Sequence, residues 1–127
     1  MATVRYMVAN VDEAVQFYTE KLGFSVVERW GPAFAMIALE DLTLWVSGPD
    51  TSAARPMPDG RLPMPGGWNR VVIEVSDIHA LAKTLLGAGV TFRNQVITGP
   101  GGSQVLIEDP SGNPIEIFQG AQQANAV

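Results

Sequence analysis

Two charged residues beside apolar, strand-like runs are the strongest candidates for a chemical role in this sequence. Glu116 lies between two isoleucines in the segment Pro-Ile-Glu-Ile-Phe at 114–118, and Arg70 directly precedes the run Val-Val-Ile at 71–73. A buried carboxylate without a partner is very costly, so Glu116 needs a counterion or a function.

The sequence lacks the cysteine and histidine residues that other common catalytic sites require. The chain contains no cysteine and one histidine, His79. Cysteine nucleophiles, disulfides and thiolate metal ligands are therefore excluded, and one histidine at a surface position gives no basis for a Ser-His-Asp triad. We interpret His79 as a surface residue, because it falls at a predicted helix start, away from the apolar stripe. The segment Gly-Pro-Gly-Gly-Ser-Gln at 99–104 lacks the lysine of a phosphate loop and predicts a hairpin turn.

The composition is typical of a folded globular protein. The 127 residues are 46% hydrophobic and 17% charged, which suits one compact domain with its own core. The net charge of −5 offers no basic patch for nucleic acid or for an anionic membrane surface. No apolar run has the length of a signal peptide or a membrane span. We therefore expect a cytoplasmic protein that binds neither nucleic acid nor membranes.

An internal repeat organises the chain. Residues 4–24 and 70–90 each read as a strand followed by a helix. Asn10 and Asp77 are the predicted N-caps of these helices, and a glycine follows the last apolar residue of each, as at many helix C-termini. Apolar residues at helical spacing predict the core-facing stripes of the two helices: Val11, Ala14, Val15, Tyr18 and Leu22 in the first, and Ile78, Leu81, Ala82, Leu85 and Leu86 in the second.

Three strand candidates follow each helix, so each half of the chain reads β-α-β-β-β. These candidates are 24–29, 33–39 and 42–46 in the first half, and 90–97, 104–107 and 114–118 in the second. The fold class is therefore α+β with two tandem modules. A module of this kind covers one sheet face with its helix, and we expect the other faces of the two modules to line a half-barrel cleft. We predict one domain over 1–127, made of module 1 at about 1–47, a linker at 48–67, module 2 at about 68–120 and a flexible tail at 121–127.

Three segments carry a resemblance to a known superfamily: VDEAVQFYTEKLGF at 11–24, VSDIHALAKTLLGAGV at 75–90 and LIEDPSGNPIEIFQ at 106–119. With the strands between them they resemble the vicinal oxygen chelate superfamily, which includes glyoxalase I, bleomycin-resistance proteins, fosfomycin-resistance enzymes and extradiol dioxygenases. The resemblance implies paired modules and assembly as a homodimer. In the catalytic branches it also implies a metal site, whose ligands come from the first and last strands of each module.

At those family positions this sequence has Thr3, Leu44 or Trp45, Arg70 and Glu116. Glu116 matches the family's carboxylate position, whereas the family often has His or Gln where Thr3 stands and usually has His where Arg70 stands. A divalent cation needs several oxygen or imidazole donors, and a guanidinium repels it. We therefore predict that the metal site is lost, that no cofactor is used, and that Arg70 pairs with Glu116 where the metal would lie, through the two hydrogen bonds that a guanidinium can make to a carboxylate. The pair would fix two strands as a structural ion pair or anchor a polar or anionic ligand group, and the two roles are compatible.

Further polar residues are expected on the cleft face. Arg5 and Glu74 share the strand parity of Thr3 and Arg70, respectively, and would extend the polar lining. An edge or surface position for either residue is equally compatible with the pattern.

Aromatic residues are candidates for the cleft wall. Trp45 and Phe34 are two of them, although core packing is the commoner role for such residues. Trp68 stands two residues before Arg70 at the end of the linker, where it suits stacking on a planar ligand, with core packing as the equal alternative. The complete predicted ligand-binding set is Arg70, Glu116, Trp68, Thr3, Arg5, Glu74, Trp45 and Phe34.

Three functions are compatible with these residues. The one that we favour is a binding protein of the bleomycin-resistance type, which holds a small, partly aromatic organic molecule without a metal. The second is a divergent glyoxalase-like lyase or isomerase, or another enzyme, with Glu116 as a general base. The third is a regulatory or interaction module. Fold alone does not decide among them, because one scaffold supports many chemistries.

Overall fold

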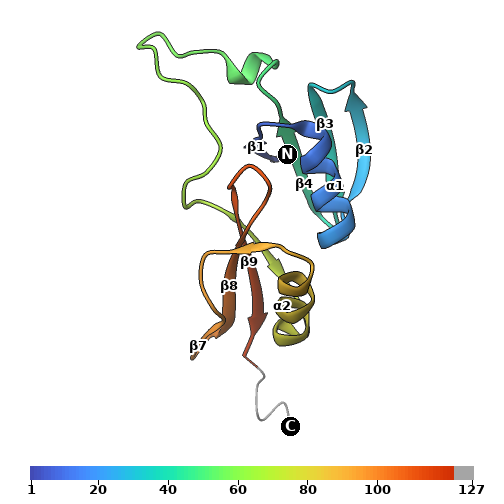
Figure 1. Cartoon of the computed structure of the whole chain (residues 1–127), viewed down its shortest axis with the longest axis vertical. Coiled ribbons are helices and arrows are strands. Elements are labelled where there is room, and N and C mark those ends of the chain that lie inside the picture. Colours follow the sequence, from blue (N-terminus) through green and yellow to red (C-terminus); the bar gives the residue numbers. More distant parts are fainter. Residues whose placement is uncertain (122–127) are drawn as a thin grey trace. The chain divides into compact units, whose positions relative to one another are not determined.

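The structure is a computed structural model in which residues 1–121 are described (Figure 1). The predicted flexible tail at 121–127 lies outside the described residues except for Ala121. The chain divides into two compact units, each with one α-helix and one sheet. Unit 1 is residues 1–67 together with the loop 110–113, and the described part of unit 2 is residues 68–109 together with 114–121.

Unit 1 is a four-stranded sheet that one helix covers on one face. Its strands lie in the order β1-β4-β3-β2, with β1 parallel to β4 and the other pairs antiparallel. Helix α1 packs against β2, β3 and β4. In chain order the elements are β1 (Val4–Met7), α1 (Val11–Leu22), β2 (Ser25–Trp30), β3 (Phe34–Leu39), β4 (Leu42–Ser47) and the short 3-10 helix η1 (Ser52–Ala54).

Unit 2 repeats this topology. Its strands lie in the order β5-β9-β8-β6, with β7 also paired to β8, and β5 is parallel to β9 as β1 is to β4. Helix α2 packs against β8 and β9. The elements are β5 (Val71–Glu74), α2 (Ile78–Gly87), β6 (Thr91–Phe92), β7 (Ile97–Gly99), β8 (Gly102–Glu108) and β9 (Pro114–Gly120). The predicted α+β class is confirmed, and the half-barrel cleft stays a prediction.

The second unit has one strand more than predicted. The strand predicted at 90–97 consists of two short strands, β6 and β7, with a bend between them. In the bend the Arg93 N–H donates to the Leu106 carbonyl at 2.9 Å, and the Asn94 side-chain oxygen accepts the Leu106 N–H at 2.8 Å. The Asn94 side chain thus replaces a backbone carbonyl of a regular ladder, because short polar side chains compete for backbone donors. The prediction of one continuous strand was wrong for this reason.

Both helices begin at the predicted N-caps. Asn10 Oδ1 accepts the N–H of Glu13 at 2.9 Å, and Asp77 Oδ1 accepts the N–H of Ala80 at 3.1 Å. Each side chain therefore satisfies one of the N–H groups that the first turn leaves without a helical partner. Helix α1 ends at Gly23, whose φ of +80° lies in the left-handed region that glycine adopts without strain.

Alternate strand residues face the helices and form the two cores. The fully buried strand residues on the helix-facing sides are Ala35, Ile37, Leu44 and Val46 in unit 1, and Val105, Ile107, Ile115 and Ile117 in unit 2. Helix α2 adds mainly Ile78 and Leu85. Leu86 was wrongly predicted to share this stripe and is 66% exposed, because it lies about 100° further round the helix than Leu85.

Gly102→Ala is expected to destabilise unit 2. Gly102 begins β8 with a φ of +143°, and an added Cβ would lie 2.2 Å from the Gln119 carbonyl oxygen on β9. We expect the free energy of unfolding to fall by roughly 2 kcal/mol, because the chain must relieve both the strained backbone and the clash. Chemical denaturation measures the change. Gly101→Ala is the matched control, since a Cβ there meets nothing within 4 Å, and equal stability of the two variants would contradict the structure.

Candidate functional site

Each sheet has a second face, opposite its helix, where strand alternation places predicted site residues. In unit 1 Arg5 is in register with Trp45, and in unit 2 Val72 is in register with Glu116. Register partners point to the same side of a sheet, and successive residues of a strand alternate between its sides. The flanking residues of Trp45 and of Glu116 are buried in the helix-facing cores. Arg5, Trp45 and Glu116 therefore belong to the open faces of their units.

Arg5 lies against two aromatic rings on the open face of unit 1. Its guanidinium carbon is 5.1 Å from the centroid of Trp45 and 5.9 Å from that of Phe34, within the range of cation–π attraction. Its Nη1 donates to the Oγ of Ser47 at 2.9 Å, and Ser47 is fully buried. The rings of Phe34 and Trp45 meet edge to face at 5.7 Å. We name Arg5, Phe34, Trp45 and Ser47 the Arg5 cluster.

The positive charge of Arg5 has no carboxylate beside it. Within residues 1–121, Arg5 forms no ion pair with a carboxylate. A guanidinium carries five N–H donors, of which the Ser47 hydroxyl occupies one. The Arg5 cluster thus combines a cation without a carboxylate partner, further N–H donors and partly exposed aromatic rings.

Arg70 binds Glu116 on the open face of unit 2. The Arg70 Nε and Nη2 donate to Glu116 Oε1 at 3.0 Å and 2.8 Å. The side chains are 28% and 11% exposed, so the carboxylate is largely removed from water. Arg70 Nη1 also donates to the Trp68 carbonyl at 3.2 Å. Both bonds to Glu116 end on Oε1, which leaves Oε2 for a further donor.

A second ion pair lies on the same sheet and was missed by sequence reasoning. Arg93 Nε donates to Glu108 Oε2 at 2.7 Å, and the Arg93 guanidinium carbon lies 4.6 Å from the centroid of the Trp68 ring. Trp68 therefore touches both arginines, and we name Glu116, Arg70, Trp68, Arg93 and Glu108 the polar cluster. The strand parity of Glu108 was a usable signal, because Glu108 alternates with the buried Val105 and Ile107. Arg93 had no comparable signal in the sequence, because it lies in a bend that the strand pattern did not predict.

The remaining predicted site residues have simpler positions. Trp68 is 69% exposed, so its alternative role in the core is wrong. Thr3 and Glu74 are exposed and belong to neither cluster. His79 is exposed on α2, as predicted. The structure thus gathers Arg5, Trp45 and Phe34 in unit 1, and Arg70, Glu116 and Trp68 in unit 2.

The metal that the family resemblance implies does not fit these residues. Trp45 is in register with the second residue of β1, just as Glu116 is with the second residue of β5, so Trp45 is the counterpart of Glu116. Leu44, the alternative, is fully buried on the helix side. The family positions therefore hold Thr3, Trp45, Arg70 and Glu116, a donor set with one carboxylate that already binds an arginine. Within residues 1–121, no three His, Asp or Glu side chains lie together as metal ligands would.

An apolar pocket of about 400 Å³ lies in unit 1 between the end of β1 and the linker at 48–67. We name it the linker pocket. Its size falls in the range of roughly 300–1,000 Å³ that is typical of small-molecule sites. The residues that line it are Met7, Val8, Ala9, Pro49, Ala54, Leu62, Pro63, Met64 and Pro65.

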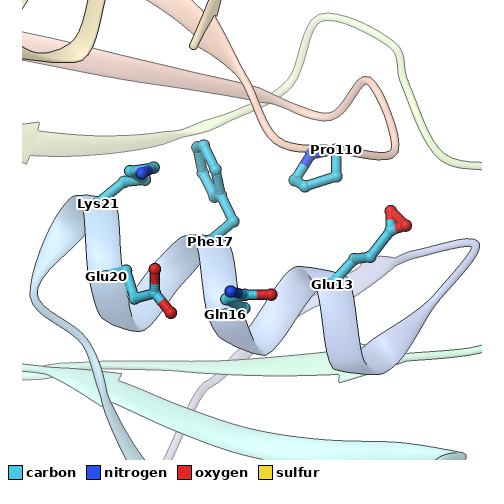
Figure 2. Close-up of a pocket in the computed structure, with 6 residues that line it drawn as sticks. All are labelled: Glu13, Gln16, Phe17, Glu20, Lys21 and Pro110. Atoms are coloured by element: carbon cyan, nitrogen blue, oxygen red, sulfur yellow. The ribbon is translucent and has the colours of Figure 1, made fainter. Parts of the chain in front are cut away.

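A shallower groove of about 230 Å³ follows the outer surface of α1 (Figure 2). The ring of Phe17 rises from the helix between Lys21 and Pro110, and Glu13 stands on the far side of Pro110. Gln16 and Glu20 complete the lining. The mixed charges of this rim favour no single ligand, and the groove holds no member of either cluster.

Comparison with known proteins establishes the family. The family model described as the Glyoxalase/Bleomycin resistance protein/Dioxygenase superfamily matches residues 1–117. The match covers most of the chain, so this protein belongs to that superfamily. A search of curated proteins gave no match.

Solved structures share the fold at low sequence identity. A lactoylglutathione lyase from Agrobacterium tumefaciens has a TM-score of 0.72 at 17% identity, covering 94% of this chain and 93% of its own. The fosfomycin resistance protein FosX from Listeria monocytogenes has a TM-score of 0.72 at 9% identity, covering 97% and 94%. A superfamily member from Sphaerobacter thermophilus has a TM-score of 0.71 at 24% identity, covering 94% and 97%. At these identities the likeness shows the fold alone.

Helices able to cross a membrane are not found among residues 1–121, since none is both long and apolar enough.

Arg70→Met is expected to cost roughly 3 kcal/mol of unfolding free energy, because it leaves the Glu116 carboxylate buried without a partner. Replacing both residues, as in Arg70→Met with Glu116→Leu, is expected to cost less than Arg70→Met alone. Chemical denaturation of the single and double variants measures the coupling.

Arg61→Met is the matched control for this change. Arg61 pairs with Asp59 at 2.8 Å, but its side chain is 82% exposed. Its loss is expected to change stability by no more than about 0.5 kcal/mol. If Arg70→Met and Arg61→Met are equally mild, Glu116 does not depend on Arg70.

Proposed function

We propose that this protein binds a small organic ligand without a metal ion. The observation that carries the proposal is the Arg5 cluster, where a guanidinium with no carboxylate partner is held against two aromatic rings on an open sheet face. The position that would supply a metal-binding carboxylate in the same strand pair is Trp45. The open face of unit 1 therefore has a guanidinium for an anion and aromatic rings for a planar group, but has no carboxylate at this position for a metal ion.

The ligand that suits the cluster is a planar or partly aromatic acid. Its anionic group would bind the free donors of Arg5 in the bidentate geometry that guanidinium groups favour. Its planar part would stack on Trp45 or Phe34, whose rings are only partly buried. Ser47 fixes the guanidinium before the ligand arrives, which lowers the ordering cost of binding.

The polar cluster of unit 2 is a separate candidate for binding an organic molecule. Its two arginines are balanced by two glutamates, so it offers hydrogen-bonding groups without net charge. The exposed ring of Trp68 lies on Arg93 and offers a stacking surface. Glu116 Oε2 would accept a hydrogen bond from a hydroxyl or amide of a molecule bound on the open face of unit 2.

An enzyme is the second candidate, and Glu116 Oε2 is the observation that favours it. A largely buried carboxylate with one oxygen free of Arg70 has the arrangement of a general base. The superfamily description covers enzymes as well as resistance proteins, and one of the similar structures is a lyase. The two candidates differ in a simple result: an enzyme consumes the ligand, and Glu116→Gln stops consumption while binding continues.

We further propose that the protein is cytoplasmic and that two copies associate, as the family resemblance implies for the assembly. Apolar side chains on the exposed edge strand β2, Val26, Val27 and Trp30, support a partner surface. Light scattering measures the mass of the assembly. A mass of twice the 13.6 kDa of one chain would support the proposed dimer, and a mass of 13.6 kDa would contradict it.

Arg5→Met is expected to weaken binding of planar acids at least tenfold, because it removes the only charge in the cluster. The probe is 2-naphthoate, compared with the uncharged 2-naphthalenemethanol, in isothermal titration calorimetry. We expect the wild-type protein to prefer the acid, and we expect a chelator in the buffer to leave the affinity unchanged. A tenfold loss corresponds to about 1.4 kcal/mol.

Lys83→Met is the control for this loss. Lys83 is exposed on α2, so its removal changes the net charge equally without touching the Arg5 cluster. If Lys83→Met weakens 2-naphthoate binding as much as Arg5→Met does, the effect is one of overall charge. If the wild-type protein does not distinguish the acid from the alcohol, the proposed anion site is wrong.

A further inference from the structure

We propose that the ligand of this protein is an amphipathic acid, with its anionic group at Arg5, its planar part on the neighbouring rings, and an aliphatic tail in the linker pocket. This inference rests on the proposed function of the Arg5 cluster and adds a second subsite to it. The ligand class is thus narrowed from planar acids to planar acids with an alkyl or similarly apolar chain.

The Arg5 cluster and the linker pocket meet at one place in the sheet. Met7 lines the pocket and lies two residues after Arg5 on β1, so both side chains point to the open face. Met7 is also in register with Ser47 on β4, and Ser47 accepts the hydrogen bond from Arg5. Pro49, two residues beyond Ser47, is a further wall of the pocket. An acid bound by Arg5 therefore has the entrance of an apolar pocket within reach of its chain.

Three backbone groups are already bonded in the wall that the end of β1 forms. The Val8 N–H donates to the Ser47 carbonyl at 2.9 Å, and the Ala9 N–H donates to the Ser111 hydroxyl at 2.8 Å. The Met7 carbonyl accepts from the Asn113 side chain at 2.7 Å. The side chains of the lining residues are all apolar, so the pocket presents a mainly apolar surface to an occupant. A hydrocarbon chain matches it, whereas a polar group would lose its water without compensation.

Hydrogen bonds hold the linker near both of its ends. The Thr51 hydroxyl donates to the Gly48 carbonyl at 2.8 Å where the linker begins, and the Gly66 N–H donates to the Asn113 side chain at 2.7 Å where it ends. Between these points Leu62 and Met64 line the pocket and remain largely exposed. Large apolar side chains held open to water beside a pocket gain free energy when a chain covers them. Figure 1 shows this linker as the extended green to yellow segment that follows β4.

A series of 4-alkylbenzoates tests the inference on the wild-type protein. Benzoate supplies the anion and the planar ring, and the alkyl group is lengthened from ethyl to butyl to octyl. We expect affinity in calorimetry to rise roughly twofold or more for each added methylene, because each one leaves water for the pocket. A flat series overturns the inference, and it leaves the proposed function standing if 2-naphthoate still binds through Arg5.

Ala54→Trp tests the location of the chain. Ala54 lines the pocket, and a tryptophan there would fill it, whereas the neighbouring Ala53 is not part of the lining and supplies the control Ala53→Trp. We expect Ala54→Trp to weaken 4-octylbenzoate at least tenfold and to leave 2-naphthoate unchanged, with no effect of Ala53→Trp. Equal effects of the two substitutions overturn the inference. The chain-length series needs no variant, so it stays decisive if Ala54→Trp does not fold.

Two further outcomes separate the inference from its alternatives. If a longer alkyl chain raises the affinity but Arg5→Met does not change the affinity for 4-octylbenzoate, the pocket binds apolar molecules regardless of charge. That result would overturn the proposal that the ligand is an amphipathic acid. If Ala54→Trp changes the mass of the assembly in light scattering and not the affinity for 4-octylbenzoate, a second copy of the chain occupies the pocket, which also overturns it.

Discussion

The pairing of Arg70 with Glu116 is the interaction on which the open face of unit 2 depends. Glu116 is flanked by two isoleucines whose side chains fill the helix-facing core of unit 2, so its own side chain must point to the open face. Parallel pairing of β5 with β9 brings Arg70 to it, and two hydrogen bonds to one oxygen satisfy a carboxylate that is largely out of water. We propose that the same pair replaces the cation that the family resemblance implies at this position.

The two units share one topology and differ in their charge balance. In unit 2 every arginine of the polar cluster has a glutamate, whereas in unit 1 Trp45 stands in the register position of Glu116 and Arg5 is left without a carboxylate. A duplicated module has thus become a balanced polar surface in one copy and a cationic, aromatic surface in the other. We therefore propose that unit 1 recognises the anion, although Glu116, the residue that stands out first in the sequence, lies in unit 2.

The parts that sequence reasoning predicted are those with a local cause. The N-caps at Asn10 and Asp77, the glycine that ends α1 and the alternation around Glu116 are each set by a few neighbouring residues. The parts it missed depend on contacts between distant residues. Asn94 interrupts a strand by binding the backbone of Leu106, and that bend brings Arg93 to Glu108 and Trp68. No periodicity in the sequence signals such a contact. The linker pocket was missed because it depends on the course of a proline-rich segment without a repeating pattern.

The central claim is that Arg70 has taken the place of a metal ion as the partner of Glu116. Equilibrium dialysis of the purified protein against Zn²⁺, Ni²⁺ and Mn²⁺, each measured by elemental analysis, tests it most directly. The predicted result is no stoichiometric binding of any of these ions, and the same result for Glu116→Gln. One tightly held ion per chain, lost in Glu116→Gln, would contradict the claim.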